Sequence, residues 1–365
     1  MHSVLITGGA GFIGANVVRA ALATEARKVV VLDALTYAGH RENLAEVEGD
    51  PRFAFVLGDV ADPEAVRRAF HDHRPDVVLH LAAESHVDRS IDGPREFVRT
   101  NVVGTHEMLL AARAHRDALA PSERERFRFV HVSTDEVFGT LGPTGTFTPD
   151  SPHAPRSPYA ASKAAADHLA AAYVETYGLP VVTTNCSNNY GPFQYPEKLI
   201  PLLLLNALEG RPLPVYGDGL QVRDWLHVED HARGLLLAAT RGVPGRRYLF
   251  GGGAERTNLA VVEGLTDALE ALRPAVGNPA LASRGIRRYG DLLTFVADRP
   301  GHDRRYAVDA SRARAELGWA PRHAFEDGLR ATVAWYLAHL DWCAAVQQGR
   351  DTRARRGVLP TGDVR

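Results

Sequence analysis

A glycine-rich segment near the start of the chain, GGAGFIG at residues 8–14, constrains the fold more than any other feature. It follows the apolar run VLIT and precedes a stretch with helix-like composition. The spacing of Gly8, Gly11 and Gly14 lets the backbone turn sharply, while the next helix directs its amino terminus at a phosphate group. Glycines alone fit an ordinary turn, but a strand before them and a helix after them favour a dinucleotide site.

Strand-like and helix-like segments alternate through the first half of the chain. The apolar runs that resemble strands covered on both faces lie at residues 4–7, 28–33, 53–60, 76–83, 127–133 and 179–186. Helix-like stretches between them include residues 13–26, 63–74 and 102–114. This alternation predicts an α/β fold, a Rossmann-type doubly wound parallel sheet. From about Asn188, prolines and turn signals indicate a smaller carboxy-terminal substrate-binding lobe.

The cofactor predicted from the sequence is NAD. Asp33 ends the second strand-like run, where a carboxylate can accept hydrogen bonds from ribose hydroxyls and repel a 2′-phosphate. Neither Ala34 nor Leu35 offers the positive charge that NADP would favour. Further residues expected at this site, several of them at the predicted ends of the third and fourth strands, are Phe12, Ile13, Asp59, Val60, Leu81, Ala82 and Ala83. Asp59 alone would also fit an ordinary loop, and Ala82 and Ala83 would also fit an ordinary core. These three residues support a cofactor site mainly when they are taken together.

Tyr159 and Lys163 form a Y-x-x-x-K pair in an alanine-rich segment that favours helix. At this spacing both side chains project from one helix face. The ammonium can bind ribose hydroxyls and lower the pKa of the tyrosine, which can then accept a proton from a sugar alcohol. On its own, such a pair is usually two ordinary surface side chains of a helix. In a chain that also has a dinucleotide-binding turn, it is the expected active site.

Two adjacent carboxylates, Asp135 and Glu136, follow the strand-like run at residues 127–133 together with Thr134. These residues also fit a purely structural role, because the N-cap of a helix that follows a strand commonly has such side chains. The carboxyl end of a parallel strand is, however, where ligands bind. A dehydration needs one group to remove a proton and another to protonate a leaving hydroxyl, and this pair can supply both if its pKa values differ.

Composition excludes several other classes of protein. The 42 Lys and Arg residues nearly balance the 44 Asp and Glu residues, so the chain has no net positive charge to attract nucleic acid or an anionic membrane. Cys186 and Cys343 lack metal-ligand spacing and are expected to be free thiols, so no metal is predicted. The first residues show no secretory signal, and the apolar stretch at residues 199–208 is too short to span a bilayer. The expected location is the cytoplasm.

The expected domain organisation has three parts. Residues 1–187 form the NAD-binding domain, residues 188–340 mainly the second lobe, and residues 341–365 a tail. Some segments after Asn188 are expected to return to the first domain. The final polar and basic segment, residues 349–365, is expected to be loosely ordered.

From about Ser3 to Tyr336, the chain resembles the extended short-chain dehydrogenase/reductase family. GGAGFIG and YAASK are shared across that family, whereas longer motifs are more specific. These motifs are AAESHVDRS (82–90), STDEVFG (133–139), NNYGPFQYPEKLIP (188–201), GDGLQVRDW (217–225) and RPGHDRRY (299–306). They are most similar to the nucleotide-sugar 4,6-dehydratases of the family that act on dTDP-glucose.

The resemblance implies a role for each residue of the catalytic group. Tyr159 would deprotonate the glucosyl O4 while hydride passes from C4 to NAD, and Thr134 would hydrogen-bond that oxygen. Glu136 would then remove the C5 proton, and Asp135 would protonate the departing 6-hydroxyl. Return of hydride to C6 and of a proton to C5 would give the 4-keto-6-deoxy sugar and regenerate NAD.

Substrate contacts are also implied by the resemblance. The residues expected near the sugar, the diphosphate or the nucleoside are Ser85, Asn188, Lys198, Tyr216, Arg223, Asn258, Arg299 and His302. Each could instead be a surface residue or a structural ion pair. The resemblance also implies that Asn189 lies on the nicotinamide side of the cofactor. The resemblance further implies a homodimer in which the helices at residues 102–114 and 159–177 pack against their mates.

Two features depart from the pattern of these enzymes. His227 stands where a tyrosine is expected, and the stretch from Arg273 to Val296 is longer than usual. The longer stretch is expected to be an outer loop or to reshape the lip of the nucleotide site.

Other functions remain open at this stage. A UDP-sugar 4-epimerase would need Tyr159, Lys163 and NAD but no acid–base pair, whereas a UDP-glucuronate decarboxylase or a GDP-mannose 4,6-dehydratase would favour serine at Asp135. A non-catalytic NAD-binding regulator would be expected to lose Tyr159, Lys163 or the carboxylates, all of which are present.

Overall fold

A parallel sheet of seven strands forms the centre of the molecule in the computed structural model, which describes residues 1–298 and 301–348. Its order is β10-β6-β5-β4-β1-β2-β3. The strands are β1 (Ser3–Thr7), β2 (Lys28–Asp33), β3 (Phe53–Leu57), β4 (Val77–His80), β5 (Arg128–Thr134), β6 (Val181–Cys186) and β10 (Arg247–Phe250). All pairings within it are parallel, which confirms the predicted Rossmann-type α/β fold.

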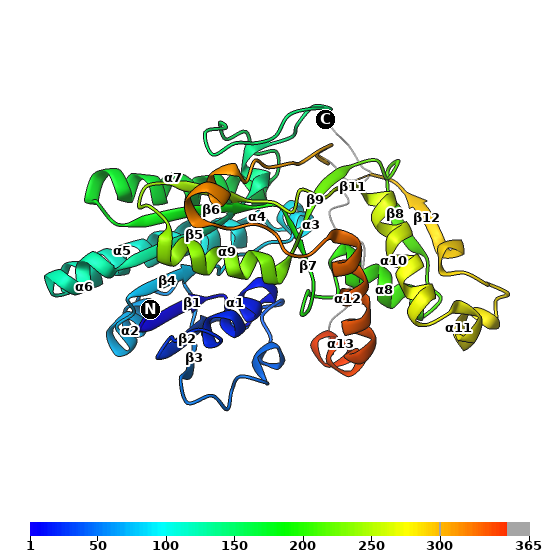
Figure 1. Cartoon of the computed structure of the whole chain (residues 1–365), viewed down its shortest axis with the longest axis horizontal. Coiled ribbons are helices and arrows are strands. Elements are labelled where there is room, and N and C mark those ends of the chain that lie inside the picture. Colours follow the sequence, from blue (N-terminus) through cyan, green and yellow to red (C-terminus); the bar gives the residue numbers. More distant parts are fainter. Residues whose placement is uncertain (299–300, 349–365) are drawn as a thin grey trace.

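Helices cover both faces of this sheet, which explains why its strands are continuous apolar runs. Val4 and Ile6 of β1 face the core beneath α1 (Phe12–Leu22) and α9 (Val228–Arg241). Leu5, between them, faces the opposite core beneath α2 (Pro63–His73), α5 (Gly104–Asp117) and α7 (Pro158–Tyr177). Figure 1 shows α1 and α9 side by side on one face of the sheet.

A second lobe lies beside the sheet (Figure 1) and has its own core. Its strands are β7 (Asn188–Tyr190), β9 (Val222–His227) and β11 (Glu255–Thr257) in one sheet, and β8 (Leu213–Tyr216) and β12 (Leu293–Val296) in another. Its helices are α8 (Leu199–Leu208), α10 (Asn258–Leu272), α12 (Phe325–Ala338) and α13 (Leu340–Gln347). Large aromatic side chains, among them Tyr190 and Trp225, fill the core between these elements.

Short helices and helical turns connect the main elements. They are η1 (Arg41–Leu44), α3 (Val87–Asp92), α4 (Pro94–Phe97), η2 (Val98–Val103), α6 (Pro121–Arg126), η3 (Asp135–Phe138), η4 (Ala275–Gly277), α11 (Pro279–Ala282), η5 (Tyr289–Leu292) and η6 (Ala313–Leu317).

Two strands end earlier than the sequence predicts. β3 ends at Leu57 and β4 at His80, so Asp59, Val60 and residues 81–83 lie in the turns beyond the strands. The chain leaves the sheet after β3 because Asp62 caps α2, its side chain accepting a hydrogen bond from the Glu64 N–H at 3.0 Å. Both turns still lie at the carboxyl edge of the sheet.

Segments after Asn188 contribute to the central sheet, as expected from the sequence. β10 pairs with β6 along its length, and α9 packs on α1 and on the sheet. The boundary between the two predicted domains therefore stays a prediction, because the chain crosses between them more than once.

The tail predicted from residue 341 does not begin there. α13 forms at this point, and Trp342 is buried and donates a hydrogen bond to the Asn43 side chain at 2.9 Å. Residues 349–365 lie outside the described residues.

The long stretch from Arg273 to Val296 is not simply an outer loop. It contains η4, α11, η5 and β12, and it buries Leu281, Tyr289 and Leu292 in the core of the second lobe. β12 pairs in parallel with β8 and ends opposite Tyr216. The stretch therefore supports the strand that carries Tyr216, because apolar side chains anchor it to that lobe.

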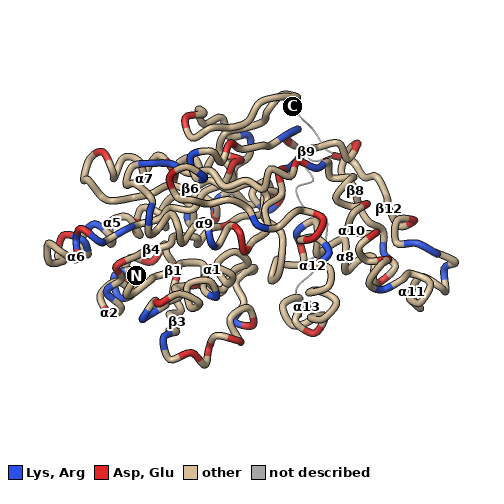
Figure 2. Tube along the Cα trace, viewed as in Figure 1, with Lys and Arg blue, Asp and Glu red and all other residues tan. Residues whose placement is uncertain are grey.

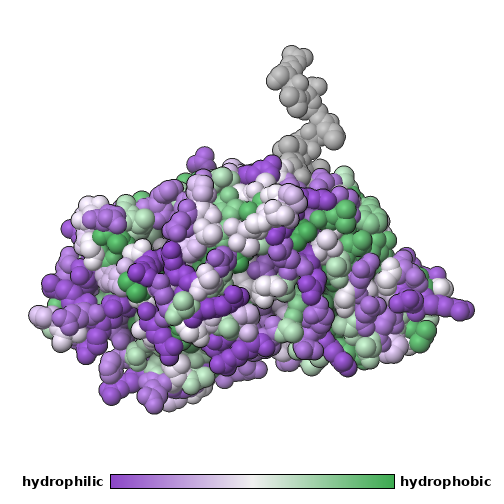
Figure 3. Space-filling model, turned by 45° about the horizontal axis from the view of Figure 1, so that its top comes forward, coloured by the Kyte–Doolittle hydropathy of each residue, from purple (hydrophilic) through white to green (hydrophobic). Residues whose placement is uncertain are grey.

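Charges of both signs are interspersed along the whole described chain (Figure 2). Hydrophobic side chains occur in groups among hydrophilic ones on the face drawn in Figure 3. Among the described helices, none is long and apolar enough to cross a bilayer.

Candidate active site

A cavity of about 360 Å³ opens at the carboxyl ends of the central strands and gathers most of the predicted site residues. The predicted cofactor residues that line it are Gly8, Gly11, Phe12, Ile13, Gly14, Asp33, Asp59, Val60, Leu81, Ala82, Ala83 and Asn189. The predicted catalytic residues that line it are Thr134, Asp135, Glu136, Tyr159 and Lys163. The fold thus brings two groups that are distant in sequence to one space of the size typical for ligands.

The glycine turn needs glycine for steric reasons. Gly8 has a φ of +69°, and a Cβ there would lie 2.8 Å from the Ala82 Cα. A Cβ on Gly14 would lie 2.0 Å from the Gly8 carbonyl oxygen. Gly11 is the N-cap of α1 and makes no side-chain cap, so the first N–H groups of this helix remain available at the cavity wall. This arrangement fits a pyrophosphate.

The Asp33 carboxylate lies at the end of β2 on the same wall. It accepts hydrogen bonds from the backbone N–H groups of Ala10 at 2.9 Å and Leu35 at 2.8 Å. Burial raises the pKa of Asp33, and these two hydrogen bonds lower it. The lining residues that follow Asp33, at positions 34 and 36–39, carry no positive charge. The wall therefore fits the ribose of NAD better than a 2′-phosphate.

Tyr159 and Lys163 lie one turn apart on α7, as predicted, but their electrostatics differ from the expectation. The Lys163 ammonium donates a hydrogen bond to the Val132 carbonyl at 2.8 Å, and burial lowers its pKa. Burial and the negative charge of Glu136 raise the pKa of Tyr159 well above its ordinary value, and a hydrogen bond with Thr134 lowers it. The expected lowering of the Tyr159 pKa by Lys163 stays a prediction, because here the Val132 carbonyl binds the ammonium and burial dominates the pKa of the phenol.

The two carboxylates sit where β5 passes into η3. The Thr134 hydroxyl donates to Asp135 Oδ1 at 3.3 Å and accepts from the Glu136 N–H at 3.3 Å. Burial and the charge of Glu136 raise the pKa of Asp135 well above its ordinary value. Asp135 Oδ2 is buried without a hydrogen-bond partner among the described residues. Asp135 is thus suited to hold a proton, as an acid must.

A buried ionic cluster behind the catalytic group was not predicted from the sequence. Asp167 accepts a hydrogen bond from His131 Nε2 at 3.0 Å and one from the Asn185 amide at 3.3 Å. The same amide donates to the Thr134 carbonyl at 2.9 Å. Asp167 lies one helical turn after Lys163, so its spacing was a usable signal, whereas its partners on β5 and β6 were not foreseeable from spacing.

Three predicted substrate residues, Ser85, Asn188 and Lys198, line the cavity. Lys198 Nζ donates to the Ser85 carbonyl at 3.2 Å. Several neighbours that also line it were not predicted, including Gln194, Tyr195 and Glu197. They occupy NNYGPFQYPEKLIP, so the motif itself was the signal.

Other predicted substrate residues lie apart from that cavity, in the second lobe. His302 Nδ1 is 2.6 Å from Asp298 Oδ1, and its ring centroid is 6.5 Å from that of Tyr216. Asn258 begins α10 and donates its N–H to the Gln221 carbonyl at 2.9 Å. Arg299 lies outside the described residues.

Arg223 connects these two groups electrostatically. It is buried on β9 and donates to the Asp303 carbonyl at 2.9 Å. Its charge also lowers the pKa of Asp135, against the larger effects of burial and Glu136. The contact of Arg223 with a diphosphate stays a prediction.

Comparisons with known proteins agree with this geometry. A model of the family described as GDP-mannose 4,6 dehydratase matches residues 5–332. The chain is 54% identical to a dTDP-glucose 4,6-dehydratase of Neisseria meningitidis serogroup B over 359 residues, covering 98% of this chain and 99% of that one. It is similar in structure to DesIV, a dTDP-glucose 4,6-dehydratase from Streptomyces venezuelae with NAD bound, at a TM-score of 0.84 and 46% identity over 94% of this chain and 99% of that one. A UDP-glucose 4-epimerase of Thermus thermophilus, in complex with NAD, has a TM-score of 0.78 at 31% identity over 92% of this chain and 99% of that one.

Proposed function

Because the chain belongs to the GDP-mannose 4,6-dehydratase family, we propose that it is an NAD-dependent 4,6-dehydratase that converts dTDP-glucose to dTDP-4-keto-6-deoxyglucose. The observation that carries this proposal is the pair Asp135 and Glu136 at the cavity that also contains Tyr159. The pair supplies the acid and the base that an elimination needs in addition to an oxidation.

The choice among nucleotide sugars rests on the relatives. The relative at 54% identity and the structural neighbour at 46% are both dTDP-glucose enzymes. The epimerase at 31% identity has the same fold and also binds NAD, so neither feature separates the two activities. Asp135 argues against the epimerase, the decarboxylase and the GDP-mannose enzyme, as expected from the sequence.

The proposed mechanism assigns proton transfers to named residues. Bound NAD would accept a hydride from C4 and return it to C6, and its oxidised ring carries a positive charge. Tyr159 takes the proton from O4, with Thr134 hydrogen-bonded to the same oxygen. Glu136 then removes the C5 proton, which the new 4-ketone acidifies, and Asp135 gives its proton to the departing 6-hydroxyl, so that water leaves. A proton returns to C5 when the hydride returns to C6.

The environment of Asp135 supports its assignment as the acid. Burial and the neighbouring charge of Glu136 keep its pKa high, so that it can hold a proton at neutral pH. For Tyr159 the opposite change is required: its pKa must fall before it can act as a base. A positive charge close to the phenol would provide this change.

Assembly and location belong to the same proposal. We expect a homodimer formed through α5 and α7, which pack on one another. Leu110 on α5 and Tyr177 on α7 are 45% and 42% exposed, so both can contribute apolar surface to such an interface. Cytoplasmic location is supported by Cys186 and Cys343, which are both buried and form no disulfide.

The test is to incubate the purified protein with dTDP-glucose, UDP-glucose and GDP-mannose separately and to identify the products by mass and NMR. The expected result is loss of water from dTDP-glucose, with NAD recovered unchanged. A product of unchanged mass, inverted at C4, would instead make the protein an epimerase.

A further inference from the structure

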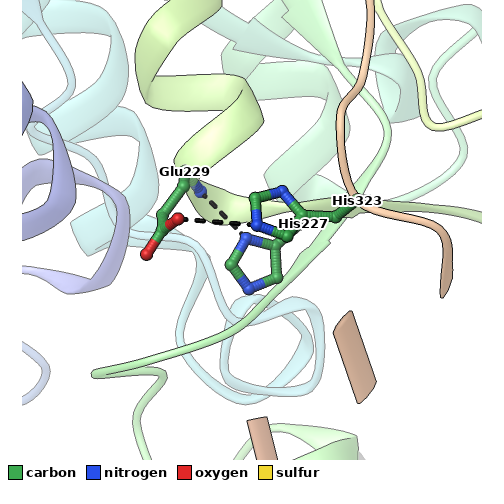
Figure 4. A group of neighbouring side chains, drawn as sticks. All are labelled: His227, Glu229 and His323. Carbon is green, nitrogen blue, oxygen red and sulfur yellow. Dashed lines mark hydrogen bonds and ion pairs between the residues drawn. The ribbon is translucent and has the colours of Figure 1, made fainter. Parts of the chain in front are cut away.

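Three potential metal ligands meet outside the cavity, at the start of α9 (Figure 4). His227 ends β9 and is the N-cap of α9, Glu229 lies in the first turn of that helix, and His323 shortly precedes α12. One ligand atom from each of the three residues lies within 4.8 Å of the others. None of the three lines the active-site cavity.

Hydrogen bonds determine where the ring protons lie. His323 Nδ1 is 2.8 Å from Asp230 Oδ2, and because a carboxylate only accepts, Nδ1 carries the proton. In the neutral ring the lone pair is therefore on Nε2, which lies 3.6 Å from Glu229 Oε2. His227 Nδ1 accepts a hydrogen bond from the Glu229 backbone N–H at 3.4 Å, and the ring would give up this long hydrogen bond on binding an ion through Nδ1.

Ligand atoms of two histidines and one carboxylate thus converge at the start of α9. The His227 ring is buried, so any ion bound there would be largely shielded from solvent on that side. The dashed lines in Figure 4 mark the contacts of Glu229 with both histidines. A cation placed among these groups would be attracted by the Glu229 carboxylate and could be bound by the imidazole nitrogens.

Asp230 supplies the outer support that metal-binding histidines usually have. Its carboxylate is buried and accepts hydrogen bonds from the backbone N–H groups of Arg322 and His323, both at 2.9 Å, as well as from the His323 ring. This contact fixes the tautomer that leaves Nε2 of His323 available.

We propose that His227, Glu229 and His323 bind one divalent transition-metal ion, with Zn²⁺ the best match and water completing its coordination. Two imidazoles and one carboxylate suit Zn²⁺, Co²⁺ or Ni²⁺, whereas Mg²⁺ and Ca²⁺ prefer oxygen ligands. The expectation from the sequence that no metal binds rested on cysteine spacing, which does not detect a site built from histidines.

Binding requires a local rearrangement of one ring. The two imidazoles are stacked, with centroids 4.0 Å apart and planes inclined by 27°. Rings in this arrangement cannot both direct in-plane lone pairs at one ion, so one must tilt. The His323 side chain is 32% exposed and Glu229 59%, so these two have room to move, while His227 is buried. Donor atoms around tetrahedral Zn²⁺ lie about 3.3 Å apart, close to the present His323–Glu229 separation.

An ion at this site would join two parts of the fold. His227 and Glu229 belong to the β9–α9 junction, whereas His323 belongs to the segment that leads into α12 of the second lobe. Because binding would favour the folded state only, the ion would raise the midpoint of thermal unfolding. The proposed role is structural and does not depend on the dehydratase activity.

The experiment uses the full chain without an affinity tag, after treatment with a chelator and its removal. Co²⁺ and Zn²⁺ are each titrated by calorimetry, and Co²⁺ is also followed by its visible absorption. The expected result is one ion per chain. H323A should lose at least about 10-fold in affinity, and D230N about 10- to 100-fold. H71A is the matched control, because exposed His71 also lies 2.8 Å from a carboxylate, that of Asp72, but has no third ligand.

Two results would overturn the proposal. One is binding to the unaltered chain no tighter than to H323A, and the other is an equal loss in H71A. The thermal midpoint provides the second measurement, since Zn²⁺ should raise it for the unaltered chain and H71A but not for H323A. If H323A folds poorly, H323Q replaces it, because glutamine keeps a polar side chain of similar size at this partly exposed position.

Discussion

His131 Nε2 donates a hydrogen bond to the carboxylate of Asp167 at 3.0 Å, and both side chains are completely buried beneath the catalytic group. Burial raises the pKa of Asp167, but the hydrogen bond with His131 and the charge of Arg247, at 3.4 Å, outweigh it and lower the pKa to about 2. Asp167 is therefore an anion that ties α7, which carries Tyr159 and Lys163, to β5 and β6.

Asp167→Asn should lower the free energy of unfolding by about 3 kcal/mol at neutral pH, because it removes the buried carboxylate that pairs with the Arg247 guanidinium. We expect kcat to fall more than KM rises, since Asn185 links Asp167 to the Thr134 carbonyl. Denaturant unfolding and steady-state kinetics measure the two effects. The stabilisation from Asp167 should be present above the unfolded pKa of about 3.8 and disappear as pH falls toward 2. Unchanged stability with unchanged kcat would contradict this positioning role.

Tyr159→Phe should reduce kcat by about 10²- to 10⁴-fold, because the general base for O4 is lost. Single-turnover kinetics should show no reduced nicotinamide forming in this variant. The control is Tyr177→Phe, at the end of the same helix but outside the cavity. Wild-type rates in the Tyr159 variant would exclude it as the base.

Glu136→Gln should slow elimination without preventing the first oxidation. Reduced nicotinamide should then accumulate on the enzyme, and its absorbance can be followed directly. Asp135→Asn, which lacks the acid but keeps the base, should also accumulate reduced nicotinamide but retain exchange of the C5 proton with deuterium from solvent. Equal exchange in both variants would mean that the two carboxylates have been assigned the wrong roles.

The two half-reactions should depend on pH in opposite directions. Oxidation at C4 should speed up as pH rises, because Tyr159 must lose its proton and its pKa is raised. Elimination should slow as pH rises through the raised pKa of Asp135, because the acid must be protonated. Stopped-flow measurement of each step across pH separates them. An elimination rate that increases with pH would rule out Asp135 as the acid.

Asp33→Ala should weaken NAD binding by about 10- to 100-fold, the cost of losing hydrogen bonds to a charged group. Its effect on NADP should be smaller, because the same carboxylate repels a 2′-phosphate. Calorimetric titration with both cofactors tests this. The nearby Asp62→Ala change, at the cap of α2, is the control for loss of a structural aspartate.

Much of the active site could be predicted because its parts are local in sequence. The glycine turn, Asp33, the Tyr159–Lys163 spacing and the adjacent carboxylates each lie within one strand end or one helix turn. The electrostatics could not be predicted in the same way. Lys163 is bound to the Val132 carbonyl, and Tyr159 is desolvated, through contacts with other strands.

By itself, the sequence determined the parallel sheet, its nucleotide turn and the residues of the catalytic group, because apolar periodicity and steric needs act over a few residues. Only the tertiary structure decided that β10 joins the edge of the sheet, that Asn185 links Asp167 to Thr134, and that His323 meets His227. These contacts join segments far apart in the chain. The physical reason is that burial, which sets both packing and pKa, depends on what covers a side chain and not on its neighbours in sequence.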